Sequence, residues 1–154
     1  MRTVLCCVIA LAVELVGQSS RNGRTVVNEM DATLLAVKTS ATPRASLSRQ
    51  LADEVMSLAE ANHRPSRATV VRFVNDLIGA LTAANQVTPD QAVELGQRIR
   101  DGLRGSEPNA ESARHLSDDL TALHVSASNT QVICKDFIAI GEQVRGPDDL
   151  PLQQ

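Results

Sequence analysis

The sequence predicts an all-α fold, a compact bundle or array of about five to six short amphipathic helices. Apolar residues recur at spacings of three and four in several separate runs, which is the period of one face of an α-helix. Turn-forming residues bound each run, and no run alternates strictly between apolar and polar side chains as a half-buried strand does. Because the connections are short, we expect successive helices to pack as antiparallel neighbours.

The N-terminal residues have the pattern of a secretory signal. One basic residue, Arg2, precedes the apolar run 4–13, and Glu14 follows it. Because this run is shorter than the roughly 18 apolar residues that cross a bilayer as a helix, we expect no permanent membrane span. We expect residues 1–19 to be a removable leader, residues 20–24 to be a flexible link, and the protein to be exported to the periplasm or the exterior. The alternative is an apolar first helix that is retained in the fold.

Helical periodicity predicts a single helical domain over residues 25–145. Its first half contains three expected helices, at about 25–40, 46–61 and 66–84, each with one apolar face. The residues expected to face the core are Val26, Val27, Met30, Leu34 and Val37 in the first helix, Leu47, Leu51, Val55 and Leu58 in the second, and Val70, Phe73, Val74, Leu77, Ile78 and Leu81 in the third.

The second half of this domain contains three more expected helices, one that begins near residue 88, then 110–125 and 130–144. The first of these opens with residues 88–91, Thr-Pro-Asp-Gln, where threonine can cap the helix, proline fits its first position and glutamine can reach back to the cap. The expected core residues are Ala92, Leu95, Ile99 and Leu103, then Ala113, Leu116, Leu120 and Leu123, and finally Ile133, Phe137, Ile140 and Val144. We expect residues 146–154 to form a loose C-terminal tail.

Residues 87–91, Val-Thr-Pro-Asp-Gln, also resemble the Leu-Thr-x-x-Gln signature of small periplasmic helical chaperones and metal-resistance adaptors. The resemblance covers five residues, and valine stands where that signature has leucine. It implies an exported helical protein with partner-binding or stress-response activity. Helix capping accounts for the same threonine, proline and glutamine without a shared family.

Composition and charge argue against several classes of function. The chain has no Trp or Tyr and two Phe, so it offers few rings on which bases or sugars could stack. Its formal net charge of −3 gives no broad attraction for a polyanion, so we expect no nucleic-acid partner. The sequence also lacks a phosphate-binding glycine loop, a Cys-x-x-Cys pair, a His-Glu-x-x-His motif and a Gly-x-Ser-x-Gly motif. These absences favour a binding protein over an enzyme.

One polar cluster is a candidate metal site. Glu111, His115 and Asp119 are spaced four residues apart on one expected helix, so they share a face. Together they could bind a divalent metal, or the carboxylates could orient His115 as a general base. The same pattern is typical of a solvated helix face with local ion pairs through Arg114. We expect no other cofactor.

One cysteine, Cys134, remains after removal of a leader that would contain Cys6 and Cys7. An exported protein meets an oxidising environment, so Cys134 is a candidate redox-active thiol or the site of an intermolecular disulfide. Because it lies beside the apolar positions Ile133 and Phe137, the alternative is a small apolar side chain at the edge of the core.

Three arginines, Arg98, Arg100 and Arg104, form a candidate surface for an anionic partner. Acidic residues alternate with arginines along the same stretch of chain, so the alternative is a solvated face on which charges neutralise each other along one helix. The expected pairs of this kind are Arg72 with Asp76 and Glu94 with Arg98.

Taken together, these patterns predict an exported helical binding module whose apolar inter-helix grooves meet another protein or a second copy of the chain. One alternative is a metal- or histidine-dependent protein centred on Glu111, His115 and Asp119. Another is a helical carrier that holds an apolar small molecule in an internal cavity.

Overall fold

The computed structural model describes residues 28–59, 63–84, 86–104 and 109–145. Within these ranges it contains six α-helices and no β-strand, so the predicted all-α fold is confirmed. The helices are α1 (Glu29–Thr39), α2 (Arg44–Leu58), α3 (Arg67–Ala83), α4 (Pro89–Leu103), α5 (Asn109–Ala122) and α6 (Ala127–Arg145). None of these helices is long and apolar enough to cross a membrane. The expected leader, link and C-terminal tail lie outside the described residues, as do Val26 and Val27.

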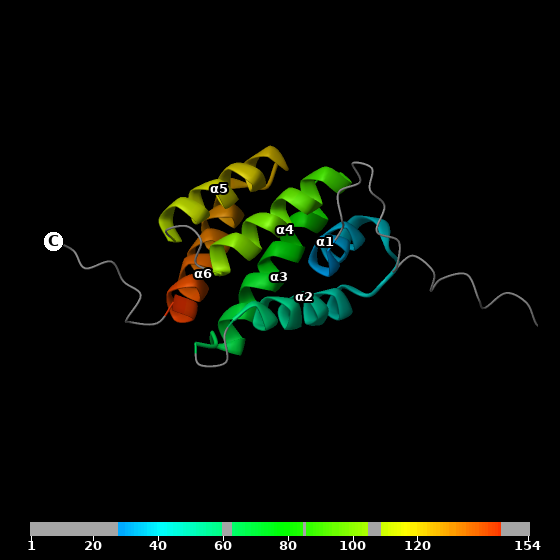
Figure 1. The fold of residues 1–154 in the computed structure, drawn as a ribbon. Coiled ribbons are helices and arrows are strands. Elements are labelled where there is room, and N and C mark those ends of the chain that lie inside the picture. The colour runs from blue at the N-terminus through cyan, green and yellow to red at the C-terminus, as the bar shows by residue number, and fades with distance from the viewer. Residues whose placement is uncertain (1–27, 60–62, 85, 105–108, 146–154) are drawn as a thin grey trace, which may run out of the picture.

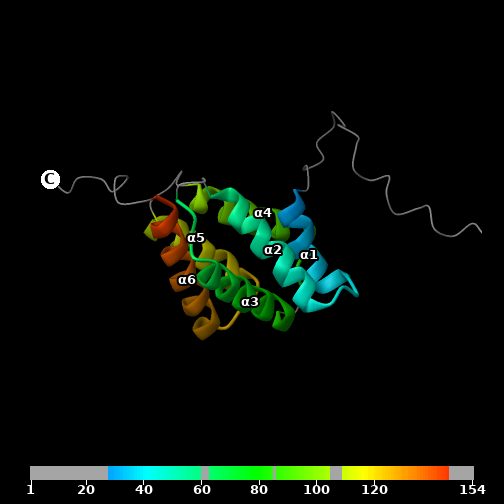
Figure 2. The same cartoon turned by 90° about the horizontal axis from the view of Figure 1, so that it is seen from below.

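Each helix packs mainly against two neighbours, and the six form a ring around one core. α1 contacts α2 and α4, α3 contacts α2 and α6, and α5 contacts α4 and α6. In both views, α1 and α2 lie at one end of the bundle and α5 and α6 at the other, with α3 and α4 on opposite faces between them (Figures 1 and 2). The expectation that successive helices pack side by side therefore does not hold for α3 and α4, which approach the core from opposite faces.

A single apolar core contains side chains from all six helices. Every core residue expected on α3 and α4 is buried. Phe73 on α3 and Phe137 on α6 meet in the core with their ring centroids 5.9 Å apart. Three expected core residues, Val37, Leu58 and Val144, are only partly buried, because each lies in the last turn of its helix.

Reciprocal side-chain caps fix where α1 and α4 begin. At α4, Thr88 Oγ1 accepts a hydrogen bond from the Gln91 N–H at 3.3 Å, and Gln91 Oε1 accepts one from the Thr88 N–H at 3.0 Å, as expected. α1 has the same reciprocal arrangement between Asn28 and Asp31, which the sequence pattern did not predict. Each arrangement satisfies backbone N–H groups that have no partner within the helix.

α5 ends at Ala122, three residues before the expected position, because the chain reverses direction just after it. His124 has a φ of 59°, in the left-handed region. Its N–H donates to the Thr121 carbonyl at 2.9 Å, and the Val125 N–H donates to the Leu120 carbonyl at 3.0 Å. This is the hydrogen-bond pattern of a Schellman motif, which terminates a helix.

α6 begins at Ala127, three residues before the expected position. Ser126 caps it, since its Oγ accepts from the Asn129 N–H at 3.4 Å and its carbonyl accepts from the Thr130 N–H at 2.9 Å. Thr130 therefore lies inside the first turn of α6 and faces α5 across the space between the two helices.

Candidate functional site

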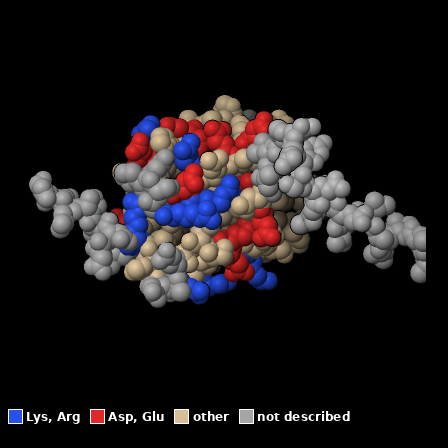
Figure 3. Space-filling view, in the orientation of Figure 1, with Lys and Arg blue, Asp and Glu red and all other residues tan. Residues whose placement is uncertain are grey.

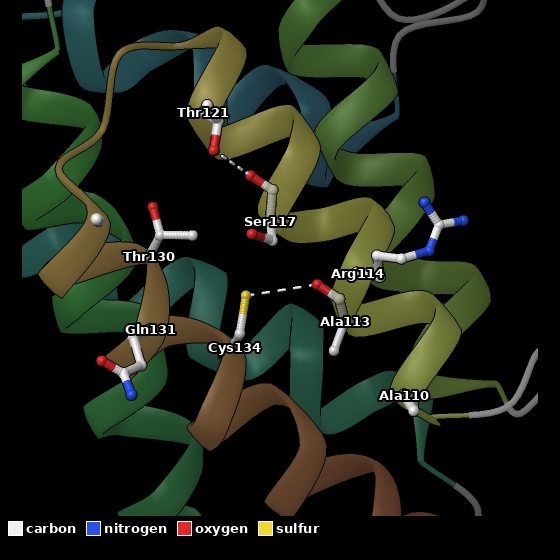
Figure 4. A pocket seen from close by; sticks show the side chains of 9 residues that line it. Ala110, Ala113, Arg114, Ser117, Thr121, Thr130, Gln131 and Cys134 are labelled. Carbon is white, nitrogen blue, oxygen red and sulfur yellow. Dashed lines mark hydrogen bonds between the residues drawn. The ribbon is translucent and has the colours of Figure 1, made fainter.

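A groove with a volume of about 390 Å³ runs between α5 and α6. From α5 it is lined by Ala110, Ala113, Arg114, Ser117 and Thr121, and from α6 by Ala127, Thr130, Gln131 and Cys134 (Figure 4). Thr121, Ala127 and Gln131 are exposed, so the groove opens to solvent. The two helices that border it, α5 and α6, lie at the end of the bundle away from α1 and α2 (Figure 1).

Helical spacing explains why this groove faces outward. Small side chains recur along α5 at intervals of three and four residues, and the same is true of Ala127, Thr130 and Cys134 on α6. Their bulky neighbours Leu116 and Phe137 are turned into the core and are 0% and 2% exposed. The two helices therefore pack tightly on their core side, while small side chains leave space on the outer side.

A hydroxyl group without a partner lies in the wall of the groove. Thr130 is 6% exposed, and its Oγ1 has no hydrogen-bond partner among the described residues. By contrast, the Thr121 hydroxyl donates to the Ser117 carbonyl at 2.8 Å. Because a buried polar group without a partner costs about 1–3 kcal/mol, a polar group from a bound molecule would stabilise this position once the Thr130 side chain rotates its buried Oγ1 towards the groove.

Cys134 lies one turn beyond Thr130 in the same groove. Its thiol is half-buried and points towards α5, where Sγ lies 3.5 Å from the Ala113 carbonyl oxygen (Figure 4). Burial raises the pKa of the Cys134 thiol, so the protonated form predominates at neutral pH. A protonated thiol is a weak nucleophile, and Cys134 packs against the core as a small side chain. A redox role for Cys134 stays a prediction.

The candidate metal residues Glu111, His115 and Asp119 have different environments. Glu111 is exposed, whereas His115 and Asp119 are half-buried. Arg98 Nε lies 3.4 Å from Asp119 Oδ2, and Arg114 Nη2 lies 2.8 Å from His115 Nε2. Among the residues that the structure describes, no three His, Cys, Asp or Glu side chains are placed to hold a metal ion. The metal and general-base roles stay predictions.

The three candidate arginines of α4 are directed to different partners. Arg98 pairs with Asp119 on α5 at 3.4 Å, and Arg100 pairs with Asp31 on α1 at 2.6 Å. Arg104 is exposed at the C-terminal cap of α4. Lys and Arg side chains lie beside Asp and Glu side chains on this face of the molecule (Figure 3). The face is therefore mixed in charge, and an anionic partner of the three arginines stays a prediction.

The expected ion pairs along single helices, Arg72 with Asp76 and Glu94 with Arg98, are wrong. Each arginine binds a carboxylate on another helix instead. Arg72 donates from Nε and Nη2 to the two oxygens of Asp136 on α6, each at 2.6 Å. The Asp136 side chain is 5% exposed, and charges attract more strongly where the surrounding dielectric constant is low. Arg72 and Arg98 therefore pair with less exposed carboxylates on neighbouring helices. The more exposed acids on the arginines' own helices do not form these pairs.

The buried aspartate Asp31 was not predicted from the sequence. Its Oδ1 accepts from Arg100 at 2.6 Å, and its Oδ2 accepts from the Asn28 N–H at 3.0 Å. A Cβ atom on Gly96 of α4 would overlap Asp31 Oδ1, so glycine at this position makes room for the ion pair. A glycine in the middle of a regular helix was the one sign of this close approach in the sequence.

Glu54 on α2 is a second polar residue that the sequence did not mark. Its Oε1 accepts hydrogen bonds from the Thr33 hydroxyl at 3.0 Å and from the Gln50 amide at 3.2 Å. Its Oε2 is buried without a partner among the described residues. Burial raises the pKa of Glu54 against those two hydrogen bonds, and the charges of Glu29 and Asp31 raise it further. Glu54 contacts α1 at the other end of the bundle from the groove, so we assign it an effect on stability.

The groove between α5 and α6 is thus the feature of the described residues that brings together small side chains, solvent access and an unpartnered hydroxyl. The ion pairs around it hold the helices to one another. No protein-family model, curated protein or solved structure matches this chain. A function is therefore argued from the geometry of this groove and from the charges beside it.

Proposed function

We propose that this chain is an exported helical module that binds a helix of a polypeptide partner in the groove between α5 and α6. The observation that carries the proposal is the groove itself, where the small side chains of two helices leave about 390 Å³ open to solvent. The export part of the proposal rests on the pattern of the N-terminal residues.

A helix is the occupant that best fits a groove of this kind. Helices pack with their axes about 8–10 Å apart, and the shortest distances occur where the side chains are small. Ser117 on α5 and Ala127 on α6 would let a third helix come close to both backbones. The amide of Gln131 and, after a rotation about its Cα–Cβ bond, the hydroxyl of Thr130 would hydrogen-bond polar side chains of that helix.

The groove is held in shape by packing and by ion pairs behind it. α5 packs on α4, and α6 packs on α3. The Arg98–Asp119 pair joins α4 to α5, and the Arg72–Asp136 pair joins α3 to α6. A preformed surface binds a partner without the entropic cost of ordering its own backbone, which supports a docking role.

The other two functions expected from the sequence have less support. A carrier of apolar molecules encloses most of its ligand, whereas this groove is open and carries hydroxyl, amide and thiol groups beside its alanines. A metal- or histidine-dependent activity would centre on Glu111, His115 and Asp119, and no observation among the described residues favours it.

Photo-crosslinking in the native compartment tests the proposed function. A benzophenone amino acid replaces Gln131 in the groove or, as the control, the exposed Asn75 on α3. We expect adducts from the Gln131 position that map by mass spectrometry to one helical segment. Ser117→Phe, which fills the groove, should suppress them, and Asn75→Phe should not. Identical adducts from both positions, or adducts unaffected by Ser117→Phe, would contradict the proposal.

A further inference from the structure

The outer face of α5 has the two features that a contact between identical copies requires. Its small side chains Ala110, Ser117 and Thr121 form one wall of the groove together with Ala113, which is buried at the base of that wall. The exposed part of this row is slim enough to enter the groove of another copy. In a two-fold symmetric contact the same surface appears on both sides and must be complementary to itself. α5 borders the groove of its own copy and can enter the groove of another, so its surface is complementary in shape to itself.

The charges beside this row are complementary to themselves as well. Arg114 and Asp118 are one turn apart on α5, with side chains 63% and 67% exposed, and residue 116 is midway between them. When two α5 helices cross antiparallel at the level of residue 116, Arg114 of each copy faces Asp118 of the other. Within one copy the two side chains are 3.4 Å apart. An exposed pair of this kind contributes only about 0.3–0.5 kcal/mol, so it can exchange partners at little cost.

The unpartnered hydroxyl of Thr130 is a second, independent observation beside the groove. Thr130 is 6% exposed on α6, and its side chain faces α5 across the groove (Figure 4). A partner's α5 would bring its own Ser117 and Thr121 hydroxyls into the groove. A rotation about the Cα–Cβ bond of Thr130 would then direct its hydroxyl to one of these oxygens.

We propose that the helix bound in the groove is α5 of a second copy of this chain, in an antiparallel two-fold dimer. This inference rests on the proposed function, because it names the partner whose helix the groove binds. Arg114 and Asp118 set the direction and position of the crossing, and the small side chains allow the close approach.

Sedimentation velocity tests the inference with charge-reversed variants. The protein is used in the form that its native cell produces. We expect the wild-type chain to form dimers as its concentration rises. Arg114→Asp gives each copy two acidic side chains beside the groove, and Asp118→Arg gives each copy two basic ones. Each variant alone should dimerise about tenfold more weakly, since two contacts between opposite charges become contacts between like charges.

An equimolar mixture of the two variants should recover the wild-type affinity, because every contact across the dimer then joins opposite charges. The mixture separates this contact from the pair within one helix, which both variants lose in the same way. Circular dichroism checks that each variant is folded. A wild-type chain that stays monomeric at every concentration, or a mixture that associates no better than either variant, overturns the inference. If the wild type is monomeric while Gln131 still crosslinks specifically to a helix of a different protein, the proposed function stands without it.

Discussion

Asp31 on α1 forms a buried ion pair with Arg100 on α4. Arg100 Nη1 lies 2.6 Å from Asp31 Oδ1, and the Asp31 side chain is 1% exposed. The second oxygen of Asp31 accepts from the Asn28 N–H, so one carboxylate both caps α1 and ties it to α4. The pair connects the first helix of the chain to the helix that leads into α5. It therefore joins the two ends of the bundle through α4.

Removing the Asp31 carboxylate should destabilise the fold strongly. Asp31→Ala leaves the Arg100 guanidinium, which is 14% exposed, without its partner, and should lower the free energy of unfolding by about 3 kcal/mol. The matched control is Asp53→Ala, which removes the exposed pair with Arg67 and should cost less than about 1 kcal/mol. Urea denaturation measures both changes. Equal effects of the two substitutions would show that the buried pair has no special role.

Two glycines in helix interiors should respond in opposite directions to alanine. At Gly96 an added Cβ would overlap Asp31 Oδ1, so Gly96→Ala should be destabilising by roughly 1–3 kcal/mol despite the better helix propensity of alanine. At Gly79 on α3 an added Cβ meets no atom within 4 Å, so Gly79→Ala should stabilise by about 0.5–1 kcal/mol. Thermal unfolding compares them. A stabilising Gly96→Ala would contradict the close approach of α1 and α4.

Glu54 should make the fold less stable as pH rises. Burial raises its pKa above the ordinary value of 4.5, so the folded protein binds the proton more tightly than the unfolded chain does. The free energy of unfolding then falls as pH rises from the unfolded pKa through the folded one, and stays lower above it. Glu54→Gln should therefore be more stable than the wild type at neutral pH, with the difference disappearing in acid. A variant that is less stable at neutral pH would show that the Glu54 charge is favourable.

Replacing His124 with glycine should stabilise the end of α5, because the backbone there is left-handed. His124 has a φ of 59°, and glycine adopts this conformation without the steric penalty of a side chain. His124→Gly should raise the free energy of unfolding by about 0.5–1 kcal/mol, whereas His124→Ala retains the penalty and should not. Chemical denaturation distinguishes the two. A loss of stability in His124→Gly would show that contacts of the imidazole outweigh the backbone term.

Periodicity predicted the faces of individual helices well, because burial of one apolar stripe follows directly from a repeat of 3.6 residues. On α3 and α4 every expected core residue is buried. Helix boundaries were predicted less well. α1 begins at Glu29 rather than near residue 25, α2 is Arg44–Leu58 rather than 46–61, and the boundaries between α5 and α6 each differ by three residues. Between α5 and α6, a left-handed histidine and a serine cap replaced the glycine or proline that usually marks a helix end.

Pairing between helices could not be predicted in the same way. Periodicity shows which face of a helix is buried, but it does not show which other helix lies against that face. Asp31 and Asp136 are therefore polar positions that only the packed structure reveals as buried partners of arginines. The small side chains of α5 at spacings of three and four were visible in the sequence. Alanine and serine suit a core and a surface equally, so the sequence did not show that Ala110 and Ser117 line an open groove while Ala113 is buried in the core.

The central claim is that α5 of one copy lies in the groove of another, and mixed-isotope crosslinking tests it most directly. Chains with benzophenone in place of Gln131 are mixed with chains labelled uniformly with nitrogen-15, and crosslinked peptides are identified by mass spectrometry. We predict crosslinks from the unlabelled position to labelled peptides of α5, between Asn109 and Ala122. Crosslinks confined to unlabelled peptides, or spread over labelled peptides from every helix, would contradict the claim.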